Sequence, residues 1–169
     1  VIEICSQCSS SGVVEAVNFN SPGQVVIAGE KNAVNSACEA MKNAGAKGTL
    51  VLPVSVPSHC SLMVSAAHEF ADSVDTVNFQ IGTVSVLHNV DASIANDINE
   101  IKSKLVEQLY KPVLWTSSVQ KMQQLGIEKI VELGPGKVLA GLTRRIDRSL
   151  SSSAVIDKAT LQSTIEEIA

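Results

Sequence analysis

The stretch VVEAVNFNSPGQVVIAG, residues 13–29, contains two runs of β-forming residues on either side of a short reversal. The reversal is SPG at residues 21–23, and proline followed by glycine suits a tight turn. The sequence therefore predicts a β-hairpin over these residues. Along its first strand, Asn18 and Asn20 alternate with apolar residues, so the two amides are expected on one face of the strand.

Outward from the hairpin, the pattern of apolar residues changes between helical and strand periods. Helices are predicted at 31–44, 62–74, 94–109 and 112–125, and residues 1–12 are typical of the end of a helix. Strands are predicted at 48–56 and 83–90. Residues 127–146 are predicted to form a strand, a glycine turn and a helix. The Ser-rich residues 149–154 are predicted to be a loose link to a short final segment. Strands that alternate with helices indicate a parallel sheet in the later part of the chain.

The composition supports an α/β protein with one globular core and room for a small second lobe. Of the 169 residues, 45 % are hydrophobic and only 3 % aromatic, which is typical of a sheet rich in valine and isoleucine. The net charge of -4 argues against nucleic acid as the main partner. No apolar run approaches the length of a membrane span, and the first residues do not resemble a signal peptide, so a cytoplasmic protein is expected.

The four cysteines do not have the spacing of a metal site or a disulfide framework. Cys5 and Cys8 form one CxxC pair, whereas Cys38 and Cys60 stand alone in different predicted elements. We expect Cys5 and Cys8 to pack on one face of a helix, in preference to redox or zinc chemistry.

The segment VLPVSVPSHCSLM, residues 51–63, places His59 at a bend that follows two prolines. Taken alone, a histidine in such a place is more often packed or capping than catalytic. If it is a base, one ring nitrogen must accept a proton while the other is held by a hydrogen bond. Cys60 is its sequence neighbour, but adjacent side chains rarely point at each other.

Four segments together resemble one family, the malonyl-CoA:acyl carrier protein transacylases of bacterial-type fatty acid synthesis. They are VNFNSPGQVVIAG at 17–29, LPVSVPSHCSLM at 52–63, LYKPVLWTSSV at 109–119 and VELGPGKVLAGL at 131–142. Their order and spacing are similar to those of the family, although the chain covers only the second half of a member. The resemblance implies a ferredoxin-like small lobe, incomplete and without its first strand, over residues 1–54, and the C-terminal part of an α/β-hydrolase-like domain over 55–169.

The resemblance also implies a chemistry. Members use a serine in a G-x-S-x-G turn, and a histidine similar to His59 takes its proton before the serine attacks malonyl-CoA. The acyl group then passes to the phosphopantetheine thiol of acyl carrier protein in a ping-pong reaction. Coenzyme A enters as a thioester substrate, and no resident cofactor or metal is expected.

Individual residues acquire expected roles from the same resemblance. The backbone carbonyl of Leu114 is expected to orient His59, and Asn20 to point toward the acyl pocket. Ser58 stands where related acyltransferases select between malonyl and branched groups. The turn GPGK at 134–137 lacks the P-loop pattern and is expected to be a strand-to-helix turn.

Basic residues on the helix after this turn admit two interpretations. Lys137, Arg144 and Arg145 suit solvated helix positions, since cations stabilise the C-terminal end of a helix. The sharper hypothesis is that they dock an acidic carrier protein or the phosphates of coenzyme A.

The chain contains no G-x-S-x-G sequence, so the resemblance predicts that it is inactive alone and needs an N-terminal half, from the same or a second chain. Two alternatives remain. One is a non-catalytic module or fragment that binds carrier protein. The other is a different hydrolase or transferase that uses His59 with Ser58, Cys60 or Ser61 as the nucleophile.

Overall fold

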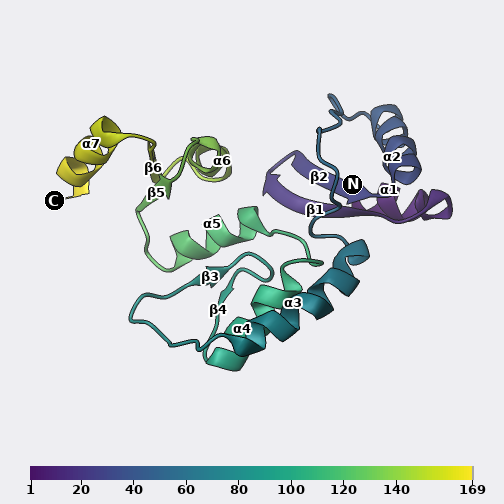
Figure 1. The fold of residues 1–169 in the computed structure, drawn as a ribbon. Helices are drawn as coiled ribbons and strands as arrows, with labels where there is room; N and C mark the ends of the chain where they lie inside the picture. Colours follow the sequence, from purple (N-terminus) through teal and green to yellow (C-terminus); the bar gives the residue numbers. More distant parts are fainter. Residues whose placement is uncertain (169) are drawn as a thin grey trace.

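The computed structural model describes residues 1–168 as an α/β arrangement of helices around three small sheets (Figure 1). The helices are α1 (Ile2–Gln7), α2 (Lys31–Asn43), α3 (Val64–Thr76), α4 (Ile98–Glu107), α5 (Trp115–Gln124), α6 (Val138–Ile146) and α7 (Lys158–Ile168), with 3-10 turns η1 (Ser9–Ser11) and η2 (Ser61–Met63). The strands are β1 (Val14–Ser21), β2 (Gln24–Gly29), β3 (Leu87–His88), β4 (Ser93–Ile94), β5 (Lys129–Leu133) and β6 (Ser151–Val155). The expected α/β class is confirmed.

The predicted hairpin is confirmed as β1 and β2, which pair antiparallel. Its register shifts twice, between Ala16 and Asn18 and between Phe19 and Ser21. Such bulges bend a strand and interrupt its alternation. The shift between Phe19 and Ser21 therefore interrupts the alternation on which the prediction of one shared face for Asn18 and Asn20 depends.

Helices α1 and α2 cover the hairpin at one end of the molecule (Figure 1). The core of this lobe consists of small and sulfur-containing side chains, listed here with the half-buried residues that pack against them: Cys5, Val14, Ala33, Ala37 and Met41, with Ile4, Cys8, Ile27 and Val34. Cys5 is buried and Cys8 half-buried, and both thiols are free. The expected packing role of the CxxC pair is consistent with this core.

The prediction of a strand at 48–56 is wrong. This segment is an irregular loop in which Leu50, Val51 and Val54 are 83 %, 67 % and 68 % exposed. An apolar run becomes a strand only when a neighbour accepts and donates its backbone hydrogen bonds, and Pro53 lacks the donor. The predicted strand at 83–90 shrinks to β3 for the same reason, since only two of its residues pair with β4.

Helices α3 and α4 pack side by side below the hairpin (Figure 1). Helix α4 begins at Ile98, four residues later than the predicted start, because Asp97 caps it by accepting from the backbone N–H of Glu100 at 2.8 Å. Lys104 on this helix is 4 % exposed, and its ammonium pairs with Asp91 at 2.6 Å and Glu100 at 3.0 Å. This network ties α4 to the loop after β3.

The predicted parallel sheet is confirmed by β5 and β6, which α6 connects. The Ser-rich segment predicted as a loose link is instead strand β6, so that prediction is wrong. Ladder pairing uses the backbone alone, and the buried Ser152 satisfies its hydroxyl by donating to the carbonyl of Ala140 at 3.0 Å. The serine-rich composition of this segment therefore did not indicate that it forms a strand.

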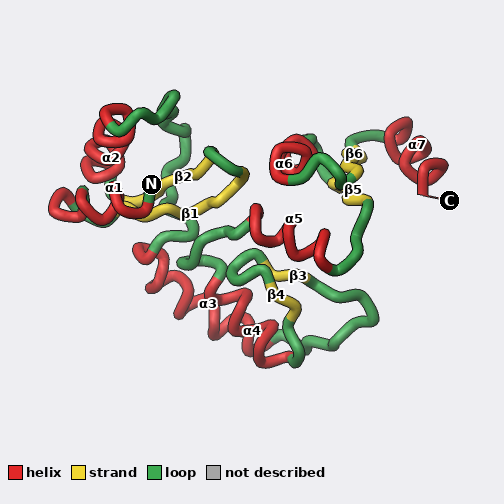
Figure 2. Tube along the Cα trace, turned by 180° about the vertical axis from the view of Figure 1, so that it is seen from behind, coloured by secondary structure: helices red, strands yellow, loops and turns green. Residues whose placement is uncertain are grey.

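The hairpin is also joined to the larger part of the chain. Phe19 N donates to the carbonyl of Val113 at 2.9 Å, and Val113 N donates to the carbonyl of Val17 at 2.8 Å. Thr116 adds a hydroxyl bond to the carbonyl of Phe19. Viewed from behind, the loop before α5 runs along the hairpin (Figure 2). Within residues 1–168, no helix is both long and apolar enough to cross a membrane.

Candidate active site

His59 occupies a backbone conformation that few residues other than glycine adopt, with φ of 65°. Such strain persists only where the surroundings hold it, and it concentrates at functional sites. Here the backbone N–H of His59 donates to the carbonyl of Leu109 at 2.9 Å, just beyond α4. The strained turn is thus fixed against the end of a packed helix.

The imidazole of His59 is held by the adjacent carbonyl. Its Nδ1 lies 2.6 Å from the carbonyl oxygen of Gln108. Because a carbonyl oxygen can only accept, Nδ1 carries the hydrogen, and Nε2 of the neutral ring keeps its lone pair. A half-buried imidazole held in this way has the form that a general base requires.

The residue that orients His59 differs from the prediction. The carbonyl of Leu114 accepts from the N–H of Ser118 at 2.9 Å and from its hydroxyl at 3.0 Å, since Leu114 is the N-cap of α5. The structure brings Gln108 to the ring in its place. Gln108 directly precedes the LYKPVLWTSSV segment, but a main-chain contact leaves no signature in the side chain.

The three nucleophilic neighbours of His59 are in different surroundings. Cys60 is fully buried, and burial raises the pKa of its thiol. The Ser61 hydroxyl donates to Glu15 at 2.6 Å, whereas Ser58 is exposed. Cys60 is therefore inaccessible and Ser61 is already engaged.

The other two histidines lie apart from this site. His88, in β3, is buried, and burial followed by the nearby Lys104 lowers its pKa. His68 is exposed on α3. Within residues 1–168, no group of three or more His, Cys, Asp or Glu side chains could hold a metal ion.

Known proteins match almost the whole chain, although no protein-family model does. A malonyl CoA-acyl carrier protein transacylase from Haemophilus influenzae is 49 % identical over 166 residues, which are 98 % of this chain and 53 % of the relative. A malonyl-transacylase solved in complex with a type II PKS acyl-carrier protein superposes with a TM-score of 0.96, at 46 % identity over 98 % of this chain and 54 % of its own. An acyl-carrier-protein S-malonyltransferase from Burkholderia pseudomallei has a TM-score of 0.95, at 44 % identity and the same two coverages.

The chain is homologous to the C-terminal half of the malonyl CoA-acyl carrier protein transacylases. It spans about half the length of the curated relatives it matches. The family resemblance inferred from the four sequence segments is therefore confirmed.

Two residues expected in the substrate pocket of a transacylase lie in different elements. Asn20 is half-buried near the end of β1, and Ser58 is exposed in the loop directly before His59. Beside Asn20, a hollow of about 370 Å³ is lined by Phe19, Ser21, Leu114 and Thr116, among others. Within residues 1–168, no hydrogen bond links the Asn20 amide to His59, so the role of Asn20 in the pocket stays a prediction.

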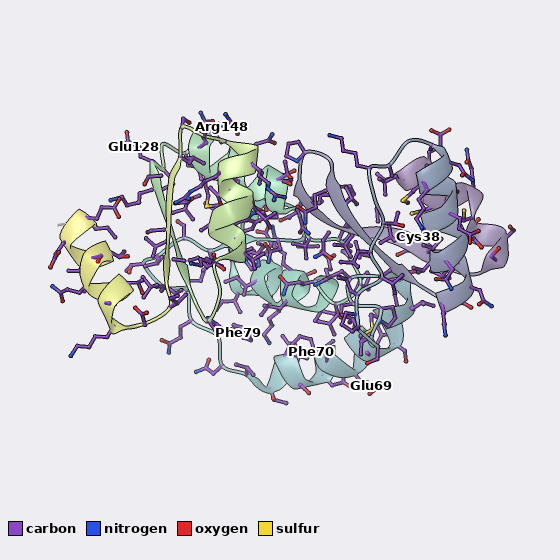
Figure 3. All side chains as sticks on the ribbon, turned by 90° about the horizontal axis from the view of Figure 1, so that it is seen from above. Cys38, Glu69, Phe70, Phe79, Glu128 and Arg148 are labelled. Carbon is purple, nitrogen blue, oxygen red and sulfur yellow. The ribbon has the colours of Figure 1, made fainter. Side chains whose placement is uncertain are left out.

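The basic residues predicted to dock a partner separate into two places. Lys137 is the exposed N-cap of α6, whereas Arg144 and Arg145 lie in its last turn. With Arg148, the two arginines line a hollow of about 650 Å³ beside Pro22 and the start of β6. Figure 3 shows Arg148 at the edge of the molecule.

Both predicted arginines also have partners inside the chain. Arg144 donates to the carbonyl of Ser152 at 2.8 Å, and Arg145 donates to the side chain of Gln24 at 2.9 Å. At the other end of α6, Glu132 accepts from the N–H of Ala140 at 2.9 Å. A carboxylate at that helix start disfavours phosphate there, which agrees with the predicted strand-to-helix turn.

Proposed function

We propose that the complete protein transfers a malonyl group from coenzyme A to the phosphopantetheine thiol of acyl carrier protein, through a seryl-enzyme intermediate. His59 is the general base, and the nucleophilic serine comes from the N-terminal half that the relatives contain. The observation that carries this proposal is the 2.6 Å contact between Nδ1 of His59 and the carbonyl of Gln108, which leaves Nε2 free. The transacylase relatives supply the substrate class.

Each half-reaction needs the same proton transfer. Nε2 of His59 takes the serine proton as the hydroxyl oxygen attacks the thioester carbonyl. Collapse of the tetrahedral intermediate breaks the carbon–sulfur bond, and the proton passes from His59 to the departing coenzyme A thiolate. The thiol of the carrier protein then gives its proton to Nε2 and attacks the seryl ester. Collapse of this second intermediate breaks the ester carbon–oxygen bond, and Nε2 returns the proton to the serine oxygen.

The neighbourhood of His59 disfavours a nucleophile from this chain. Cys60 has no exposed surface, and the hydroxyl of Ser61 is committed to Glu15. We assign Ser58 and Asn20 to the acyl pocket, where an exposed serine next to the base can contact the malonyl group. A cytoplasmic location also stays a prediction.

The test uses the joined protein, in which this chain is fused to the N-terminal half of the Haemophilus influenzae relative. After incubation with malonyl-CoA, intact-mass and peptide measurements should find one malonyl group on a serine of the N-terminal half. Addition of acyl carrier protein should remove it. Malonyl on Ser58 or Ser61 would support the alternative nucleophile, whereas carrier binding without acylation would support the non-catalytic module.

We further propose that the hollow beside α6 docks the acidic carrier protein through Arg145 and Arg148. Reversal of both to glutamate in the joined protein should raise KM for carrier protein by about tenfold or more, because like charges then face the partner. The kcat at saturating carrier protein should change little. Arg144 is left intact because it holds β6 through Ser152.

The matched control for docking is Lys42→Glu, which reverses an exposed cation on α2, an element on the far side of the hairpin (Figure 1). It should leave KM for carrier protein unchanged. Equal KM values for the control and the double arginine variant would exclude this docking surface.

A further inference from the structure

Glu15 on β1 makes an unusual contact with the segment that contains His59. One carboxylate oxygen accepts from the backbone N–H of Ser61 at 2.9 Å, and the other accepts from the Ser61 hydroxyl at 2.6 Å. Hydrogen bonds to an ionised carboxylate are roughly twice as strong as neutral ones, and the paired geometry fixes direction as well as distance. The contact joins residues 46 positions apart in sequence, from the hairpin lobe to η2.

The carboxylate of Glu15 is ionised at neutral pH. Partial burial alone would favour its protonated form, but hydrogen bonds from Ser61 and Cys60 outweigh burial and lower the pKa. Glu15 therefore presents two acceptor oxygens to Ser61 under the conditions in which His59 must be neutral.

The turn at His59 is consequently held on both sides. On one side, the backbone N–H of His59 donates to the carbonyl of Leu109, and its ring nitrogen Nδ1 contacts the carbonyl of Gln108. On the other side, Ser61 is held by Glu15, and the intervening Cys60 is fully buried. A residue at φ of 65° tends to relax when one anchor is lost, and relaxation would turn the ring away from Gln108.

We propose that Glu15 is a positioning residue, which holds Ser61 so that the ring of His59 keeps its Nδ1–H on the Gln108 carbonyl. Both carboxylate oxygens of Glu15 are engaged by Ser61, so in this role Glu15 acts through the backbone of residues 59–61 and not on the reacting atoms. The inference rests on the proposed role of His59 as the base.

The experiment compares Glu15→Gln and Ser61→Ala in the joined protein. Glutamine has nearly the same shape, but it offers one acceptor oxygen where the carboxylate offers two. We expect Glu15→Gln to lower kcat by about tenfold, as losses of supporting contacts around active groups commonly do. The KM values for malonyl-CoA and carrier protein should stay within about twofold. Ser61→Ala, which keeps its N–H, should show a smaller decrease of the same kind.

The matched control is Glu30→Gln. Glu30 lies in the same lobe and accepts from the backbone N–H of Val13 at 3.0 Å, but it has no contact with the His59 turn among the hydrogen bonds of residues 1–168. Its replacement should leave kcat unchanged even if it lowers thermal stability.

A second measurement separates positioning from general stability. Nitrogen NMR of the histidine rings should show the Nδ1–H form of His59 in the parent and a mixture of both neutral forms in Glu15→Gln, with His68 and His88 unchanged. Normal kcat together with an unchanged His59 ring in Glu15→Gln would overturn the inference. If the parent is inactive, or if His59→Ala retains full activity, the proposed function itself is wrong, so the two failures are distinguishable.

Discussion

Replacing His59 with alanine in the joined protein should lower kcat for malonyl transfer by about a thousandfold. In the proposed mechanism the serine hydroxyl would lose the group that takes its proton, because the Nδ1 contact with Gln108 leaves Nε2 of His59 for that role. The KM for malonyl-CoA should change much less, because in the proposed mechanism His59 takes part in proton transfer and not in substrate binding. Single-turnover acylation by malonyl-CoA measures this step directly.

His59→Ala adds backbone strain to the loss of the imidazole, and His59→Asn separates these two effects. Alanine disfavours the φ of 65° found at this residue, whereas asparagine adopts left-handed conformations more readily and still cannot act as a base. Both variants should lose activity to a similar extent. His68→Ala removes an exposed histidine on α3 and should retain parental kcat. Transfer that survives in His59→Asn would remove His59 from the mechanism.

The sequence correctly predicted the elements whose formation depends mainly on residues within the element itself. The hairpin has its own turn residues, and the helices have amphipathic faces that a single segment displays. The strand wrongly predicted at 48–56 and the missed strand β6 depend instead on residues outside the segment. Whether a run of residues becomes a strand depends on a partner far away in sequence, as Ile130 is for Ser152.

The residues of the candidate site show the same difference between local signals and distant contacts. His59 could be identified because its segment, PSHCSLM, has a distinctive sequence. Gln108 could not be assigned from the sequence, because its contact uses a backbone carbonyl that every residue has. Glu15 left one signal, a lone acidic residue within the otherwise apolar run VVEAV, but nothing in the sequence indicates that Ser61 is its partner.

Gly29→Ala should lower the free energy of unfolding of the joined protein by about 3 kcal/mol. Gly29 ends β2 with φ of 154°, and a Cβ there would lie 2.0 Å from the carbonyl oxygen of Val13 and 2.7 Å from Cα of Val14. Backbone cannot be moved aside as a flexible side chain can, so β1 would have to separate from β2. Val14 would then leave the core beneath α2. Urea unfolding measures the loss.

Gly48→Ala is the matched control, because a Cβ at Gly48 would meet nothing within 4 Å, and its free energy of unfolding should stay within about 0.5 kcal/mol of the parent. A loss below about 1 kcal/mol for Gly29→Ala would mean that β1 can shift freely, against the close packing of the two strands. The substitution also bears on activity. Glu15 directly follows Val14 on β1, so a displaced strand would pull its carboxylate away from Ser61. Folded Gly29→Ala protein should therefore show the same lowered kcat and the same mixed His59 ring forms as Glu15→Gln, because the carboxylate of Glu15 links the hairpin to the turn that contains His59.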